Sequence, residues 1–386
     1  MRRSLALFLW LLMVYFISGL IVNILQVCLL PLWYISRNHF RRINAVLCYS
    51  HWSMLTFAGE WWGELDIKFY GKKEDYDLIG KEHCLVLPNH RSDIDWMIGW
   101  ILCERTGILG GAKCYMKYYL KYLPVIGWMW WCAEYVFLKR NWNADFPMLK
   151  RSLDELKDYP IPMFLGIFPE GTRFTEAKHE NSLQFSRSRG LPELKHHLFP
   201  RTKGVIITLK CLKDTLPAVY DIESAYPGDC KPTMKHLLKG GKCEVHFYLR
   251  RIPIEEIPCN SDDEISKWCT QLFVEKDAIM SDFVKNGKFA GNRVNLPRRQ
   301  KNLYFVIFWN LLLSAPILYT LYSLLVSRLV VSIPVVGALL LIGYVAFRIL
   351  VHFTDSKKGS KFGLKQNSKV QKEERNGLHD DGVKQD

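Results

Sequence analysis

Short apolar runs alternate with amphipathic stretches between about residues 64 and 300, and this alternation predicts an α/β domain. The apolar runs have the length and the β-branched or aromatic content of strands, whereas the amphipathic stretches have helical spacing. The predicted helices cover residues 93–105, 145–157 and 262–283. The predicted strands cover residues 65–70, 84–87, 134–138, 163–168, 204–209, 217–222 and 243–249.

Three longer apolar stretches predict membrane segments on either side of this domain. Residues 5–31 carry no charge, and residues 303–327 and 329–347 are each close to the roughly 20 residues that cross a bilayer. Arg328 separates the last two, which predicts a transmembrane hairpin. The first stretch either spans the bilayer or pairs with the aromatic stretch 43–62 as a monotopic helical pair in one leaflet.

The chain therefore divides into four predicted regions: an N-terminal membrane anchor at 1–62, the α/β domain at 63–300, a transmembrane hairpin at 301–352 and a disordered polar tail at 353–386. Lysines and arginines cluster at 298–301 and 357–365, which favours a cytosolic location for the α/β domain. Trp128, Trp130 and Trp131 lie in a predicted membrane-facing loop ahead of the strand 134–138, and burial in the core is the alternative.

The chain is strongly basic, and its charge favours anionic partners. It has 386 residues, a formal net charge of +14 and 49% hydrophobic residues. No nucleic-acid recognition motif occurs, so a bilayer surface and phosphorylated substrates explain the charge better than a nucleic acid. Part of the excess of lysine and arginine over acidic residues can equally serve to keep the protein surface soluble. Eleven cysteines without a Cys-x-x-Cys pair argue against a disulfide framework and against zinc, and indicate a reducing compartment.

A histidine and an aspartate follow the predicted strand 84–87, and they are suited to acid–base chemistry. His90 precedes the predicted helix, Ser92 fits its N-cap, and Asp95 lies in its first turn. A carboxylate so close can hold the imidazole in one tautomer and stabilise its protonated form, which predicts that His90 is a general base for a hydroxyl group. The alternative is that Asp95 only caps the helix.

A second polar cluster, Glu170-Gly171-Thr172-Arg173, follows the predicted strand 163–168. Sites in open α/β sheets gather at the carboxyl ends of strands, so we expect the two clusters to share one site. Gly171 also has a purely conformational explanation, because glycine permits a positive φ in the turn after a strand.

With these blocks the sequence resembles the 1-acylglycerol-3-phosphate O-acyltransferases (lysophosphatidic acid acyltransferases). The family's His-x4-Asp and Glu-Gly-Thr-Arg blocks match His90 to Asp95 and Glu170 to Arg173. Further matching blocks are Lys117, Pro124 and Gly127, the run Phe137-Leu138-Lys139-Arg140, and, loosely, the run Leu216-Pro217-Ala218-Val219-Tyr220. The strings at 170–178 and 200–204 are similar to the eukaryotic endoplasmic-reticulum branch, close to the animal gamma and delta forms.

The resemblance implies a glycerolipid acyltransferase-type mixed sheet flanked by helices, and an endoplasmic-reticulum enzyme with acyl-CoA as co-substrate, no cofactor and no metal. The implied partners are lysophosphatidic acid, acyl-CoA and the lipid bilayer, with no nucleic acid and no known protein partner. Arg173, with Arg140 as a second candidate, suits the acceptor phosphate, because a guanidinium fork matches phosphate geometry. Glu170 is expected to hydrogen-bond the glycerol backbone or to orient Arg173. Further expected contacts with CoA phosphates or headgroups come from Lys117, Arg201 and Lys203.

Three other interpretations stay open at this point. His90, Asp93 and Asp95 could ligate a metal in a hydrolase, although no further ligand cluster with suitable spacing supports this. The chain could be a non-catalytic membrane scaffold of the same fold. The acceptor could be another lysophospholipid, such as lysophosphatidylinositol or lysocardiolipin, and Arg173 favours lysophosphatidic acid over these.

Overall fold

The computed structural model describes residues 5–228, 233–238 and 241–326, together with Pro334, Gly337, Ala338, Leu341, Tyr344, Val345 and Arg348. Apart from those isolated positions, the predicted second span at 329–347 and the polar tail at 353–386 lie outside the described residues.

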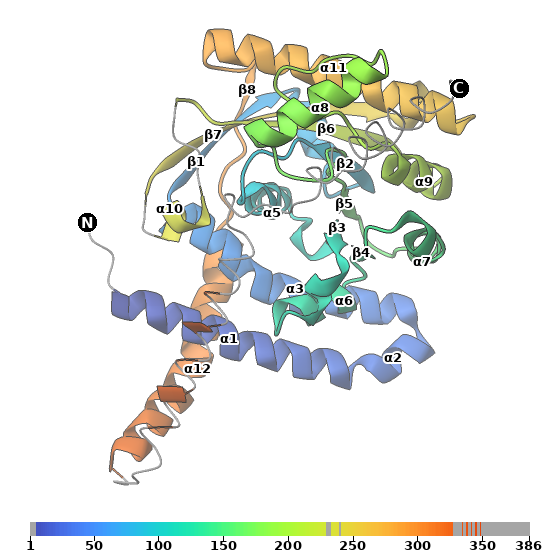
Figure 1. The fold of residues 1–386 in the computed structure, drawn as a ribbon. Helices are drawn as coiled ribbons and strands as arrows, with labels where there is room; N and C mark the ends of the chain where they lie inside the picture. Colours follow the sequence, from blue (N-terminus) through green and yellow to red (C-terminus); the bar gives the residue numbers. More distant parts are fainter. Residues whose placement is uncertain are drawn as a thin grey trace, which may run out of the picture.

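The described strands form one mixed sheet, which confirms the predicted α/β class (Figure 1). Its order is β4-β3-β5-β2-β6-β7-β1-β8. The five strands from β4 to β6 run parallel to one another, β7 is antiparallel to β6, β1 is parallel to β7, and β8 is antiparallel to β1. The strands are β1 (Leu65–Gly71), β2 (Cys84–Pro88), β3 (Ala112–Lys117), β4 (Val136–Leu138), β5 (Phe164–Gly166), β6 (Ala218–Ala225), β7 (Cys243–Pro253) and β8 (Arg293–Val294).

Helices cover both faces of this sheet. The α-helices are α1 (Leu5–Cys28), α2 (Leu30–Ile35), α3 (Arg37–Phe57), α4 (Lys73–Leu78), α5 (Asp95–Thr106), α6 (Ile126–Cys132), α7 (Trp142–Asp154), α8 (Glu176–Ser188), α9 (Lys203–Leu212), α10 (Met234–Leu238), α11 (Asp262–Asn286) and α12 (Lys301–Val326). Shorter helical turns are η1 (Ala58–Trp62), η2 (Leu109–Gly111), η3 (Tyr118–Tyr122) and η4 (Ile254–Glu256).

The core has two main layers because side chains alternate along each strand. In β2, Cys84 and Val86 pack into the layer formed with α3 and α5, whereas Leu85 and Leu87 pack into the layer formed with α7, α9 and α11. A strand buried on both faces reads as a continuous apolar run, and this is why β2 was predictable.

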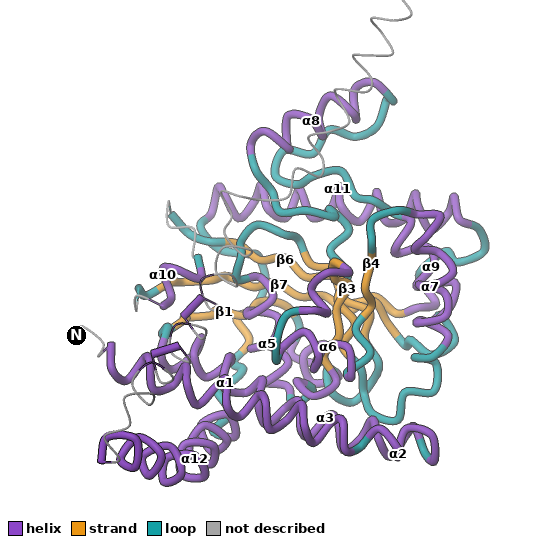
Figure 2. The backbone as a smooth tube through the Cα atoms, turned by 60° about the horizontal axis from the view of Figure 1, so that its bottom comes forward, coloured by secondary structure: helices purple, strands orange, loops and turns teal. Residues whose placement is uncertain are grey.

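The N-terminal helices are joined to the domain through α3. In Figure 2, α1 and α3 run side by side and α2 connects them. Trp52 of α3 is completely buried and stacks on Trp100 of α5, with 4.8 Å between ring centroids. Arg41 of α3 pairs with Glu134 at 2.7 Å.

Two of the described helices are long and apolar enough to cross a bilayer, over Leu7–Cys28 and Lys301–Ser323. The second belongs to α12, which packs against α3 at its start and then extends away from the domain (Figure 1). Trp309 of α12 donates a hydrogen bond to the Ser50 carbonyl oxygen of α3 at 2.9 Å. The packing of α1 against α3 is compatible with both the spanning and the monotopic interpretation of the N-terminal segment.

Several predicted elements were wrong. Residues 204–209 lie in helix α9 and not in a strand, because the buried positions Val205, Leu209 and Leu212 follow helical spacing that a six-residue window is too short to show. The predicted loop ahead of β4 contains helix α6, on which Trp128 and Trp131 are exposed, while Trp130 packs against the core. Strand β3 was not predicted.

Candidate active site

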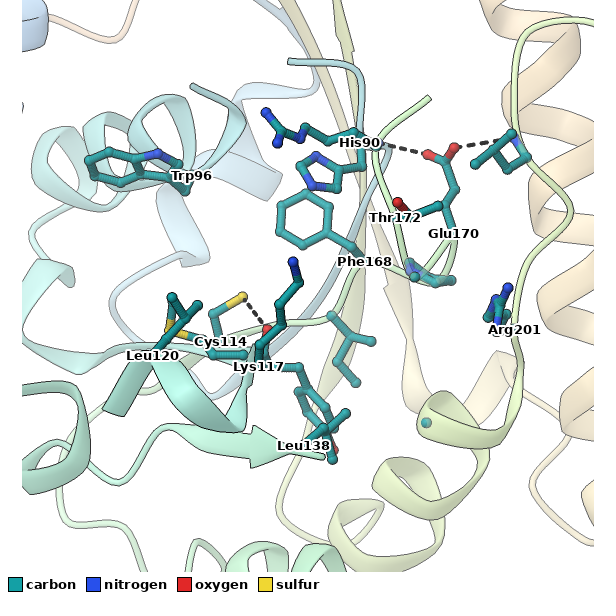
Figure 3. A pocket seen from close by; sticks show the side chains of 18 of the residues that line it. His90, Trp96, Cys114, Lys117, Leu120, Leu138, Phe168, Glu170, Thr172 and Arg201 are labelled. Atoms are coloured by element: carbon teal, nitrogen blue, oxygen red, sulfur yellow. Dashed lines mark hydrogen bonds between the residues drawn. The ribbon is translucent and has the colours of Figure 1, made fainter. Parts of the chain in front are cut away.

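The carboxyl ends of the five parallel strands lie at one edge of the sheet, and four of these strands carry a polar residue of the predicted site. Lys117 ends β3, Arg140 follows β4, Glu170 to Arg173 follow β5, and His90 follows β2. The two predicted clusters therefore share one site, because β2 and β5 are neighbours in the sheet. All of these residues line a single cavity of about 1670 Å³ (Figure 3).

His90 and Asp95 form the predicted pair, with 2.8 Å between His90 Nδ1 and Asp95 Oδ2. Asp95 Oδ2 also accepts hydrogen bonds from the backbone N–H groups of Arg91 and Ser92, at 2.7 and 2.9 Å. Helix α5 begins at Asp95 and its N-cap position is Ile94, so the predicted N-cap at Ser92 is wrong. The Ser92 hydroxyl instead accepts from the Ile94 N–H, at 3.3 Å, in the turn ahead of the helix. Tyr226, just after β6, donates to Oδ1 at 2.5 Å, a contact that sequence reasoning missed.

This arrangement fixes the tautomer of His90. The ionised carboxylate accepts from Nδ1–H, which leaves the lone pair on Nε2. Burial lowers the pKa of His90 below its usual 6.5, although the hydrogen bond and charge of Asp95 act in the opposite direction. The imidazole is therefore neutral at pH 7, the form that a general base requires. Its ring packs on Phe168, with 4.4 Å between centroids.

Glu170 supports the loop that carries the base, and its expected role toward a glycerol backbone or Arg173 stays a prediction. Its Oε1 accepts from the His90 backbone N–H at 2.7 Å, and its Oε2 accepts from the Leu198 N–H at 3.2 Å. Burial raises the pKa of Glu170 to about 7. The glutamate thus ties the β2 loop to the loop before α9.

The Gly171-Thr172-Arg173 turn gathers cations around itself. Gly171 has a φ of +68°, which confirms the conformational explanation for this glycine. Arg140, itself held at a φ of +66°, donates to the Gly171 carbonyl oxygen at 3.1 Å. Lys178, which sequence reasoning missed, donates to Thr172 Oγ1 at 2.7 Å and to the Arg173 carbonyl oxygen at 3.3 Å. Lys178 lies in the first turn of α8, where Thr175 is the N-cap.

The three predicted peripheral cations take different positions along the cavity wall. The Lys117 side chain extends toward Phe168 and His90 in Figure 3. Arg201 packs its side chain against Gly171, because a Cβ added there would lie 3.0 Å from Arg201 Cδ. Lys203 starts α9, with its ammonium 5.2 Å from the centroid of the Trp142 ring.

The opposite part of the cavity is apolar. Its walls come from the N-terminal helices α1 and α3 and from the α5–α6 region, and include Phe16, Met54, Trp96, Leu120 and Trp130. In Figure 3, His90 lies between Trp96 and Leu120 on one side and Thr172 and Arg201 on the other. The imidazole therefore stands where an apolar region meets a cationic one.

A buried charge network behind the β2 loop was also missed. His197 is fully buried, 2.9 Å from Glu223 and 3.0 Å from Asp277. Burial alone would lower the pKa of His197, but these two carboxylates outweigh it and raise the pKa to about 9. Asn89, beside the base, donates to Glu223 at 2.5 Å, so the network reaches the loop that carries His90.

Comparison with known proteins identifies relatives along most of the chain. Residues 66–209 match the family model described as "Acyltransferase", and residues 236–309 match "Acyltransferase C-terminus". The mouse (Mus musculus) 1-acyl-sn-glycerol-3-phosphate acyltransferase delta is 40% identical over 358 residues, which covers 93% of this chain and 94% of the relative. The human (Homo sapiens) delta protein is 40% identical, covering 91% and 92%, and the human gamma protein is 37% identical, covering 91% and 93%.

A solved structure, the 1-acyl-sn-glycerophosphate (LPA) acyltransferase of Thermotoga maritima, aligns with 69% of this chain and 98% of its own length, at 14% identity and a TM-score of 0.38. At that TM-score the alignment adds nothing to the fold described above.

Proposed function

The chain belongs to the 1-acyl-sn-glycerol-3-phosphate acyltransferase family, and from this premise we propose that it transfers an acyl chain from acyl-CoA to the sn-2 hydroxyl of 1-acyl-sn-glycerol 3-phosphate. The products are phosphatidic acid and CoA. Support comes from relatives of that name at about 40% identity over 93% of the chain. The observation that carries the mechanism is the His90–Asp95 pair at the boundary between the apolar and the cationic parts of one cavity.

His90 acts as the general base in this proposal. Its Nε2 takes the proton of the acceptor hydroxyl as the oxygen attacks the thioester carbonyl carbon. Asp95 holds the ring by Nδ1 and stabilises the imidazolium that forms. When the C–S bond breaks, the imidazolium returns the proton to the departing thiolate. A thioester is already activated, so positioning and one base suffice without a covalent enzyme intermediate.

The cationic part of the cavity binds the anionic groups of the substrates. Arg173 lies in the turn after β5, and Arg140 of the loop after β4 donates to the Gly171 carbonyl oxygen of that turn; both are assigned to the acceptor phosphate. Lys117, Arg201 and Lys203 line the remaining wall and are assigned to phosphates of CoA or of lipid headgroups. Neither assignment requires a cofactor or a metal ion.

The apolar part of the cavity receives acyl chains, and its walls on α1 and α3 place it next to the membrane segments. The two long apolar helices indicate that the enzyme is membrane-associated. We assign it to the endoplasmic-reticulum membrane with a cytosolic catalytic domain, because basic residues flank the start of α12 at 298–301 and family likeness favours that membrane.

The test is acyl transfer by purified protein in detergent micelles, with oleoyl-CoA and either lysophosphatidic acid or lysophosphatidylinositol. We expect wild-type protein to acylate lysophosphatidic acid, and His90→Ala to lower kcat by about 10²–10⁴-fold. His39→Ala, which removes a histidine bonded to Ser36 outside the cavity, is the control. Undiminished turnover in His90→Ala would contradict the base assignment.

Arg173→Ala tests the acceptor site separately. We expect it to raise the KM for lysophosphatidic acid more than the KM for 1-acylglycerol, which lacks the phosphate. Arg187→Ala, an exposed arginine of α8 paired with Glu193, controls for loss of charge near the site. Wild-type protein that acylates only lysophosphatidylinositol would refute the proposed acceptor in favour of the phosphodiester one.

A further inference from the structure

Lys178 is a buried cation whose charge no carboxylate balances within the part of the chain that the structure describes. Its side chain lines the cavity, and the residue is only 4% exposed. Its ammonium group donates to the Thr172 hydroxyl and to the Arg173 carbonyl oxygen, which are both neutral. A buried ammonium group is costly unless it meets an opposite charge. The position therefore calls for an anion that the polypeptide does not supply.

Other cations lie close enough to Lys178 for their charges to act on it. Lys117 comes from the end of β3, Arg140 from the loop after β4, and Arg173 from the turn after β5, while His90 follows β2. Arg140 and Lys178 bind the same turn, because Arg140 donates to the Gly171 carbonyl oxygen and Lys178 donates to Thr172 Oγ1. Burial, with the charges of Arg173, Arg140 and Lys117, lowers the pKa of Lys178 to about 8. The repulsion among these groups is relieved when a polyanionic ligand enters.

We propose that Lys178 binds the phosphate of the acceptor directly and makes the site selective for a phosphate monoester over a phosphodiester headgroup. This inference rests on the proposed function and names the residue that sets the acceptor class. A phosphate monoester carries between about 1.5 and 2 negative charges at pH 7, whereas a diester carries one. Two arginines can satisfy a single charge bidentately, and a further buried ammonium is matched by the second charge.

A purely structural role would need no charge at this position. A neutral donor can make the hydrogen bonds that Lys178 makes to Thr172 and to the Arg173 carbonyl oxygen. Lys113 is a second buried lysine with which the effect of removing Lys178 can be compared. Lys113 is also buried, donates to the Ala133 carbonyl oxygen, and has a pKa lowered to about 8 by burial, yet it does not line the cavity. It is therefore the matched control for removal of a buried lysine.

The experiment compares wild-type enzyme with Lys178→Met, Lys178→Arg and Lys113→Met, using oleoyl-CoA with lysophosphatidic acid, lysophosphatidylinositol or 1-acylglycerol. We expect Lys178→Met to lower kcat/KM for lysophosphatidic acid about 10- to 100-fold, mainly through KM, because one charge-assisted hydrogen bond is lost. For the other two acceptors the change should stay within about threefold. Lys178→Arg should retain most of the selectivity, and Lys113→Met should leave it unchanged.

A pH series gives a second readout that a structural role would not move. In wild-type enzyme, kcat/KM for lysophosphatidic acid should fall as the pH rises through about 8, where free Lys178 loses its proton. The arginine of Lys178→Arg keeps its positive charge above pH 8, so this fall in kcat/KM at high pH should disappear. Its persistence in Lys178→Arg would overturn the inference.

Glycerol 3-phosphate as a probe separates this inference from the proposed function, because its binding needs no turnover. We expect it to raise the Tm of wild-type protein and of Lys113→Met but not that of Lys178→Met. Equal protection of Lys178→Met, or an equal loss of activity on all three acceptors, refutes the role of Lys178. Protection of the wild type without any acyl transfer would refute the proposed reaction and keep the anion site.

Discussion

Replacing Asp95 with asparagine separates two contributions of this side chain, its geometry and its charge. Three donors converge on Oδ2, namely His90 Nδ1 and the backbone N–H groups of Arg91 and Ser92, at 2.7 to 2.9 Å. In Asp95→Asn an amide NH2 at that position would face two backbone donors. The carbonyl oxygen must therefore occupy it, and the NH2 group then faces the Tyr226 hydroxyl, which can accept.

The tautomer of His90 consequently survives in Asp95→Asn, and only the negative charge is lost. A hydrogen bond to a charged group contributes about 1.5–3 kcal/mol and a neutral one about 0.5–1.5 kcal/mol, so the imidazolium loses about 1–2 kcal/mol of stabilisation. That corresponds to a kcat about 5- to 30-fold lower. Asp95→Ala removes the geometry as well and should approach His90→Ala, with a loss of about 10²–10⁴-fold.

Release of CoA thiol from oleoyl-CoA in the presence of lysophosphatidic acid measures this directly, across a pH series. The acid limb of kcat/KM reports the pKa of free His90. Since Asp95 raises that pKa by its hydrogen bond and charge, the limb should move to lower pH in Asp95→Asn. Activity in Asp95→Asn as low as in His90→Ala, with an unchanged Tm, would show that the wrong tautomer forms and would refute the orientation argument.

Two further predictions test the surroundings of the pair. Tyr226→Phe removes the donor to Asp95 Oδ1 and should lower kcat about 10-fold with little change in KM, whereas Tyr220→Phe, which removes a similar bond from Tyr220 to Glu82, should affect only stability. His197 has a folded-state pKa of about 9, so its protonation contributes about 3 kcal/mol to the free energy of unfolding. This contribution is fully present below pH 6.5 and is lost as the pH rises through 9. The difference in unfolding free energy between wild type and His197→Gln should therefore shrink between pH 6 and pH 10, and a constant difference would contradict the charged state of His197.

The elements and contacts predicted correctly from the sequence are those that a local residue pattern determines. Strand β2 was found because its two-sided burial produces an unbroken apolar run, and the His90–Asp95 contact was found because it joins residues only five positions apart. Helix α9 was missed because its apolar face covers ten residues and the window searched covered six.

What the sequence did not show depends on tertiary contacts between distant segments. Tyr226 reaches Asp95 across 131 positions, and Glu170 reaches the His90 backbone across 80. No periodicity or spacing brings such partners together, because the sheet order alone decides which strand ends become neighbours. The contact of Glu170 with the His90 backbone was missed for this reason, since it forms only once β2 and β5 pair.

The burial of α3 has a practical consequence for anyone who wishes to trim the chain to a water-soluble fragment. Cutting before β1 would strip the indole of Trp100 of its stacking partner Trp52 and leave Glu134 without Arg41. The same cut would remove Glu60, which holds Arg105 at 2.7 Å. Because the first sixty residues complete the interior as well as approaching lipid, preparations should retain them and use a lipid-like medium, such as nanodiscs, in place of truncation.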